Sequence, residues 1–163
     1  MATKPKTLEL TVSSAEGLHI RGKPANKNVF AVVRAESLTS HTTAMTNGND
    51  NGFHTWNEKF LVELGAHARC LTIEVKCKTE TGLVRDIGVA RIAVSDFLGG
   101  SVPDHSLQSL CYRLRDWDGR DNGVVNFFVR VAVPPAAAEN DISSSSGGVV
   151  TAIRPYSNNS IDN

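Results

Sequence analysis

Two short stretches of the chain hold most of its clustered positive charge. Residues 17–35 contain four cations and no acid, and residues 76–85 contain three cations against Glu80. The seven cations are Arg21, Lys23, Lys27, Arg34, Lys76, Lys78 and Arg85. If both stretches are loops at one end of a domain, their fields add and attract an anionic partner. The alternative is that they are ordinary solvated loop charges.

Residues for bond-making chemistry are present but not arranged for it. The histidines and cysteines lack the spacing of a zinc site, and no nucleophile has an evident base. They are His19, His41, His54, His67, His105, Cys70, Cys77 and Cys111. Serine-hydrolase, Walker and dinucleotide motifs are also missing. The sequence therefore predicts a protein that is not an enzyme and has no metal or other cofactor.

Composition excludes two further classes of function. Lys and Arg number 17 and Asp and Glu number 17, a balance that argues against a nucleic-acid coat protein. No apolar run reaches the roughly 18 residues that a membrane span requires. Three cysteines, with no apolar run near Met1 to act as a signal peptide, indicate a reducing, intracellular compartment.

Hydrophobic periodicity predicts the elements that position the basic stretches. The dominant period is two, which is typical of strands, and turn residues separate the strands. Eight strands are expected, at 8–12, 29–33, 40–46, 60–62, 71–76, 87–94, 110–115 and 125–133. Gly88 indicates a bulge, and Ser95 could cap a single helical turn. This pattern predicts an all-β fold, an eight-stranded antiparallel β-sandwich.

The composition changes at Pro134, which divides the chain into a folded domain (1–133) and a tail (134–163). The tail is rich in Ser and Asn and is predicted to be disordered, because it cannot bury enough apolar surface to offset its ordering entropy. Its one apolar stretch, residues 149–153, is either a docking segment or a stray short run.

Three segments of residues 7–133 resemble C2 domains. LELTVSSAEGL (8–18) is similar to the opening strand of that family, GFHTWNEKF (52–60) to its central turn, and IGVARI (87–92) to a later strand. SAEGL, VSDFLGG and YRLRD with GVVN further resemble the small plant BONZAI-associated proteins. The resemblance implies an eight-stranded sandwich that binds phospholipid, partners a copine and restrains defence-related cell death. It also implies a cytoplasmic protein, peripheral on the plasma membrane.

The chain departs from the family's calcium-binding pattern. Counted along the motifs, the five expected ligand positions fall on Gly22, Asn28, Lys76, Lys78 and Arg85, with Asp86 one residue out of register. Calcium prefers six to eight oxygen ligands, and three of these positions carry cations that would repel it. We therefore expect lipid binding without calcium, through Arg21, Lys23, Lys27, Lys76, Lys78 and Arg85.

Two readings of the function remain open. In the first, the domain binds anionic membrane surfaces and recruits a partner protein. In the second, it is a pure protein-interaction module whose lipid contact is incidental. Trp117, between Asp116 and Asp118, is either an exposed anchor for a partner or a turn aromatic folded onto the sandwich edge.

Overall fold

The computed structural model describes residues 5–36, 39–99, 103, 105–133 and 149–151. Within them the fold is built from strands, with one short 3₁₀ turn, η1 (Val94–Asp96). The strands are β1 (Lys6–Glu16), β2 (His19–Ile20), β3 (Lys23–Pro24), β4 (Val29–Arg34), β5 (Ser40–Thr42), β6 (His54–Leu64), β7 (Cys70–Lys78), β8 (Val84–Ala93), β9 (Leu107–Arg115), β10 (Asp121–Val131) and β11 (Val149–Thr151).

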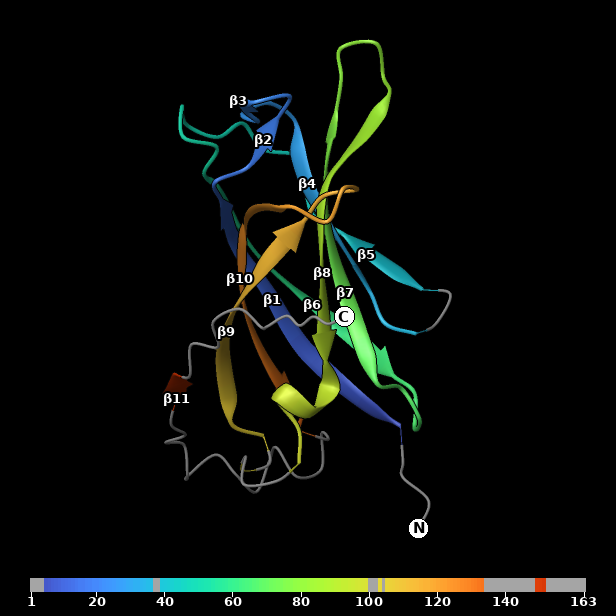
Figure 1. Cartoon of the computed structure of the whole chain (residues 1–163). Helices are drawn as coiled ribbons and strands as arrows, with labels where there is room; N and C mark the ends of the chain where they lie inside the picture. The colour runs from blue at the N-terminus through green and yellow to red at the C-terminus, as the bar shows by residue number, and fades with distance from the viewer. Residues whose placement is uncertain (1–4, 37–38, 100–102, 104, 134–148, 152–163) are drawn as a thin grey trace.

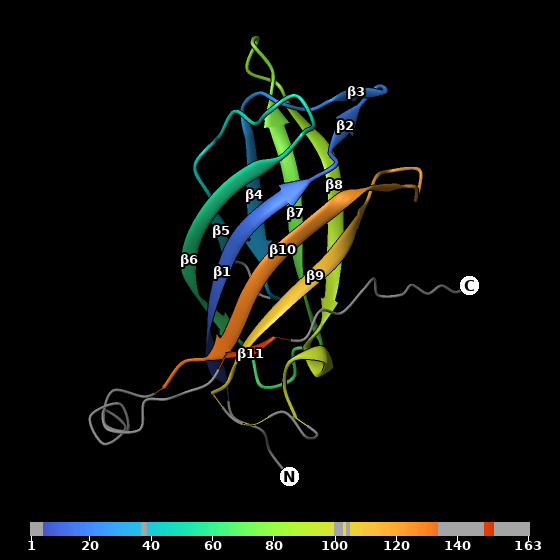
Figure 2. The same ribbon diagram turned by 90° about the vertical axis from the view of Figure 1, so that its left-hand side faces the viewer.

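Eight of these strands form two antiparallel layers (Figures 1 and 2). One layer has the order β5-β4-β7-β8 and the other the order β9-β10-β1-β6. A single residue pair, Val89 with Arg115, joins β8 to β9, so the layers separate along this line. The predicted all-β, eight-stranded antiparallel sandwich is confirmed.

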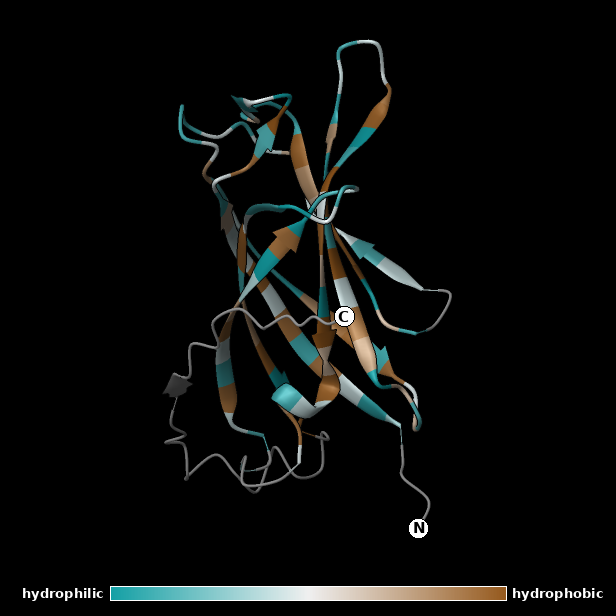
Figure 3. Ribbon diagram, viewed as in Figure 1, coloured by the Kyte–Doolittle hydropathy of each residue, from teal (hydrophilic) through white to brown (hydrophobic). Residues whose placement is uncertain are grey.

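The core lies between the layers and follows the period-two pattern. Leu8, Leu10 and Val12 on β1 have no solvent exposure, and neither have Ile73 and Val75 on β7. Alternate side chains of a strand point to opposite faces, so one face of each layer is apolar and the other polar. The alternation is visible along the ribbons in Figure 3.

Several local predictions need adjustment. Ser95 lies inside η1 and does not cap it. The residue at the N-cap position of η1 is Ala93, and no side chain forms a capping hydrogen bond there. Strand β5 ends at Thr42, and Thr46 makes only an isolated bridge. The bulge at Gly88 is confirmed, because Val75 pairs with Gly88 while Lys76 pairs with Asp86.

Within the stretch predicted to be a disordered tail, only residues 149–151 lie among the described residues. They form β11, which runs parallel to the first residues of β9 (Figure 2). Val149 pairs with Leu107, Val150 with Gln108 and Thr151 with Ser109. The remaining residues of 134–163 lie outside the part of the chain that the structure describes.

Candidate functional site

Four chain connections meet at one end of the sandwich, the upper end in Figure 1. They are residues 17–28 with the β2–β3 hairpin, 43–53, 79–83 and 116–120. We call this the loop end. Residues 17–28 carry three of the four cations of the first basic stretch, and the long β7–β8 hairpin carries the second stretch. The fourth cation, Arg34, ends β4 instead and lies 3.3 Å from Glu74 Oε1.

Buried hydrogen bonds hold the connections of the loop end together. His54 is 1% exposed, and its Nε2 lies 2.8 Å from the Ala25 carbonyl oxygen while its Nδ1 lies 3.0 Å from Thr46 Oγ1. A carbonyl oxygen only accepts, so Nε2 is the donor to Ala25. The Lys78 backbone N–H donates to the Asn28 carbonyl at 3.0 Å, which ties the first connection to β7. These hydrogen bonds therefore fix the backbone from which the basic loops project.

Four of the six predicted lipid-binding residues are exposed at the loop end. Arg21 and Lys23 lie in or beside the β2–β3 hairpin, Lys27 follows it, and Lys78 ends β7. Lys27 and Lys78 line one hollow of about 250 Å³ between the two basic stretches. The structure thus brings cations from both stretches close to one another.

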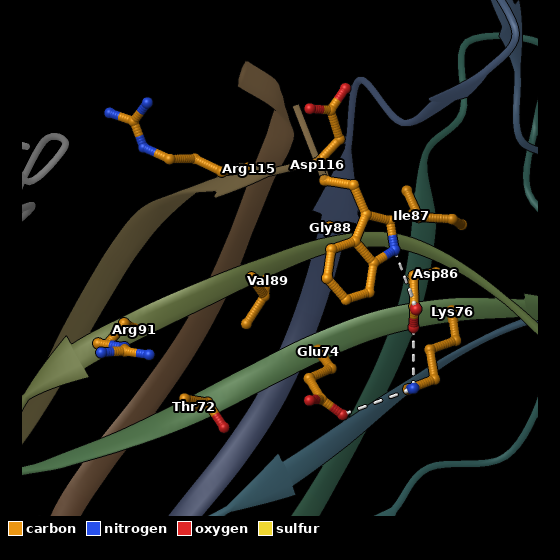
Figure 4. Close-up of a pocket in the computed structure, with 11 residues that line it drawn as sticks. Thr72, Glu74, Lys76, Asp86, Ile87, Gly88, Val89, Arg91, Arg115 and Asp116 are labelled. Carbon is orange, nitrogen blue, oxygen red and sulfur yellow. Dashed lines mark hydrogen bonds and ion pairs between the residues drawn. The ribbon is translucent and has the colours of Figure 1, made fainter. Parts of the chain in front are cut away.

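Lys76 and Arg85 are placed differently. The prediction that residues 76–85 form a loop was too wide, because β7 continues to Lys78 and β8 begins at Val84. Lys76 is half-buried on β7, and its Nζ lies 2.9 Å from Asp86 Oδ1 and 3.7 Å from Glu74 Oε1 (Figure 4). Arg85 is also half-buried. Lys76 is already paired with carboxylates of its own chain.

The positions expected to hold calcium ligands provide few oxygens. Gly22 has no side chain, and the Asn28 side chain donates to the Lys78 carbonyl at 3.3 Å. Asp86, the nearby carboxylate, pairs with Lys76 and also accepts from Trp117 Nε1 at 3.2 Å. Among the described residues, no group of three or more His, Cys, Asp or Glu side chains is placed to hold a metal ion.

The sequence analysis missed an apolar pair on the β7–β8 hairpin. Leu83 and Val84 are 63% and 53% exposed, although their neighbours Gly82 and Arg85 are typical of a polar turn. Thr79 closes this turn, since its backbone donates to the Leu83 carbonyl at 2.8 Å and its Oγ1 accepts from the Leu83 backbone at 3.1 Å. An apolar pair between a turn glycine and a cation was the signal that could have revealed it.

The β9–β10 connection adds negative charge that the sequence analysis did not place. A hollow of about 610 Å³ at the loop end has Arg21 and Arg120 in its lining together with Asp116, Asp118 and Asp121. The side of the loop end nearest β9 and β10 is therefore mixed in charge. Of the exposed loop-end cations, Lys27 and Lys78 share the hollow beside the β7–β8 hairpin.

Trp117 is 85% exposed, although its indole is tethered to Asp86. It borders a hollow of about 490 Å³ on the outer face of β7 and β8, where these strands meet the end of β9 (Figure 4). Lys76, Arg91 and Arg115 supply cations to this hollow, and three carboxylates balance them. The high exposure of Trp117 is consistent with an anchor for a partner protein, and the hydrogen bond to Asp86 holds the indole ring in place.

The three cysteines are free thiols. Burial raises the pKa of Cys77 and of Cys111, and it also raises the pKa of Cys70, whose Sγ donates to Glu36 at 3.4 Å. A thiol with a raised pKa is ionised to only a small extent at neutral pH, and because the thiolate is the reactive form, such a thiol is a poor nucleophile. None of the three has the environment of a catalytic cysteine.

No described helix is long and apolar enough to cross a membrane. "BON1-associated protein 2" of Arabidopsis thaliana is 34% identical over 151 residues, covering 91% of this chain and 72% of the relative.

Two solved structures show the same fold at low sequence identity. The C2A domain of plant Extended Synaptotagmin 1 superimposes with a TM-score of 0.61 at 14% identity, over 79% of this chain and 97% of that one. Human GIVD cytosolic phospholipase A2 gives 0.62 at 12% identity, over 83% of this chain and 18% of the enzyme. A family model of the C2 domain matches residues 6–109, so the chain belongs to the C2 domain family.

Proposed function

We propose that this protein is a non-enzymatic adaptor that binds anionic phospholipid surfaces through its loop end and recruits a partner protein there. The observation that carries the proposal is the exposed Leu83–Val84 pair, which lies on the same hairpin as the exposed Lys78. Apolar side chains that enter a bilayer beside cations at its anionic surface combine the two attractions that a peripheral protein uses.

The magnitudes favour reversible attachment. Each cation near an anionic leaflet contributes about 1 kcal/mol, so Arg21, Lys23, Lys27 and Lys78 together contribute at most about 4 kcal/mol, because the carboxylates around Arg21 reduce its share. Burying the exposed parts of Leu83 and Val84 adds about 2 kcal/mol. The sum corresponds to weak binding, and its electrostatic part weakens as salt screens the charges.

We further propose that this binding needs no calcium. Lys76 neutralises Asp86, the carboxylate nearest the expected ligand positions, and Lys78 and Arg85 occupy two of those positions. The loop-end cations are in place without a metal ion, so the loop end attracts an anionic surface whether or not calcium is present.

The proposed partner and biological setting rest on the similarity of this chain to the Arabidopsis relative. The Arabidopsis relative is named for its association with BON1, and on this basis we propose that the chain recruits a copine-type partner. It would act on the cytoplasmic face of the plasma membrane as a negative regulator of plant cell death and defence.

The second candidate is a protein-interaction module with incidental lipid contact. Trp117 favours it, because a largely exposed tryptophan beside a hollow of balanced charge suits a protein partner.

Cosedimentation with vesicles separates the two candidates. The full chain is mixed with phosphatidylserine–phosphatidylcholine vesicles or phosphatidylcholine vesicles, each with calcium and with chelator, at low and physiological salt. The adaptor proposal expects binding that requires phosphatidylserine, declines with salt and is equal with calcium and chelator. Absence of binding at low salt would favour the interaction module, and a requirement for calcium would contradict metal-free binding.

A further inference from the structure

The edges of the two layers differ in how they avoid pairing with other chains. An open strand edge accepts another strand unless it is short, charged or covered. The outer edge of one layer is β5, which has only three residues. The outer edge of the other is β6, which carries Glu58, Lys59 and Glu63. Strand β5 is therefore protected by its shortness, and strand β6 by its charged residues.

The line where the layers separate exposes two more edges, on β8 and β9. Strand β8 carries Arg85, Asp86 and Arg91. Residues 107–112 of β9, in contrast, contain no charged residue and no proline. Among the described residues, positions 108–112 pair with β10 on one side, and β8 pairs with β9 only at Arg115. This part of β9 lacks the usual protection.

In the structure, β11 lies against the first half of this unprotected edge (Figure 2). Its residues, Val149, Val150 and Thr151, are all β-branched and uncharged, which favours an extended conformation. Glycines and serines precede them in the sequence, so the segment follows a stretch of low structural propensity. A three-residue strand gains few hydrogen bonds against its ordering entropy, so its hold on the edge is weak.

We propose that residues 107–112 of β9 form a strand-addition site, and that the chain's own segment 149–151 occupies this site in cis as a removable cover. An extended segment of another chain can pair with β9 only when β11 has left. Strand β11 lies at the end of the sandwich opposite the β7–β8 hairpin (Figure 2). The site is therefore independent of the proposed membrane contact and accessible while the loop end faces a bilayer.

The test uses the full chain with Val149→Pro and Val150→Pro together, which removes the backbone N–H groups of two of the segment's three residues. The matched control has Val149→Ile and Val150→Ile, which keep the β-branched shape. Hydrogen exchange in residues 107–112 should be up to about tenfold faster in the proline variant than in the control. Exchange in residues 124–129 of β10 should be equal in both.

The second arm adds the segment in trans as a labelled synthetic peptide, SGGVVTAIR, which corresponds to residues 146–154. This peptide should bind the proline variant saturably and restore slow exchange in residues 107–112, whereas SGGPPTAIR should not. Dimerisation of the proline variant that the peptide reverses would support the same site. Both variants should bind phosphatidylserine vesicles equally.

Three results would overturn the inference. Equal exchange of residues 107–112 in the two variants would show that the segment does not cover the edge. Faster exchange that the peptide fails to reverse would show that the edge does not accept a strand in trans. Faster exchange throughout β10 would show that β11 is an integral part of the fold, which is incompatible with a removable cover.

Discussion

Reversing the charge of two lysines on one strand should have two different effects. Lys78 is exposed at the end of β7, and the structure shows no ion pair for it among the described residues. Lys76, two residues earlier, has a side chain only 20% exposed and lies 2.9 Å from Asp86 Oδ1 and 3.7 Å from Glu74 Oε1. We therefore expect Lys78→Glu to impair membrane binding and Lys76→Glu to impair folding.

The magnitudes follow from these environments. Lys78→Glu removes about 1 kcal/mol of attraction to an anionic leaflet and adds a similar repulsion, which amounts to a roughly thirtyfold weaker vesicle partition. Lys76→Glu replaces a charge-assisted hydrogen bond with a third carboxylate beside two others. This change should cost about 2 kcal/mol of unfolding free energy, or about 4–8 °C in Tm.

Vesicle cosedimentation and thermal unfolding, measured on the same samples, separate the two effects. Lys6→Glu is the matched control, because Lys6 is also exposed and begins β1 at the far end of the sandwich. It should bind phosphatidylserine vesicles nearly as the wild type does. Lys78→Glu should keep the wild-type Tm within about 1 °C.

Two results would refute this reasoning. If Lys78→Glu and Lys6→Glu bind vesicles equally at low salt, the loop end is not the membrane contact. If Lys76→Glu leaves the Tm unchanged, the ion pair between Lys76 and Asp86 contributes nothing to the stability of the fold. Lys76 would then behave like the exposed cations of the loop end.

Four further outcomes are expected. Replacing Leu83 and Val84 with Ser should weaken vesicle binding by about thirtyfold, from the apolar area lost, and leave the Tm unchanged; normal binding would exclude insertion of the hairpin. Gly123→Ala should cost about 2–4 kcal/mol in chemical denaturation, because φ is +89° and a Cβ would overlap the Glu16 carbonyl oxygen. Burial raises the pKa of Cys77 from its ordinary value of 9.0, so stability should fall as pH rises past that value. A Cys77→Ser variant should lose its share of this alkaline dependence, while Cys70 and Cys111, whose pKa values burial also raises, keep theirs. Iodoacetamide at pH 8 should label Cys77 more slowly than a free cysteine.

The strand pattern was predictable because it depends on local alternation. Leu8, Leu10 and Val12 show period two in the sequence and are fully buried in the structure. The bulge at Gly88 was also predictable, since glycine inside a strand pattern often marks one. The ends of β5 and β7 were not, because hydrogen bonding to neighbouring strands decides where a polar segment stops being a strand.

The sequence by itself determined which residue types stand at the candidate site: cations where a calcium-binding relative has carboxylates, and an apolar pair on the same hairpin. Only the tertiary structure decided which of these cations are free to meet a partner. Lys76 and Lys78 look alike in the sequence, but the bulge in β8 brings Asp86 opposite Lys76 and leaves Lys78 in solvent. The distinction depends on cross-strand register, which joins residues ten positions apart and which no local pattern contains.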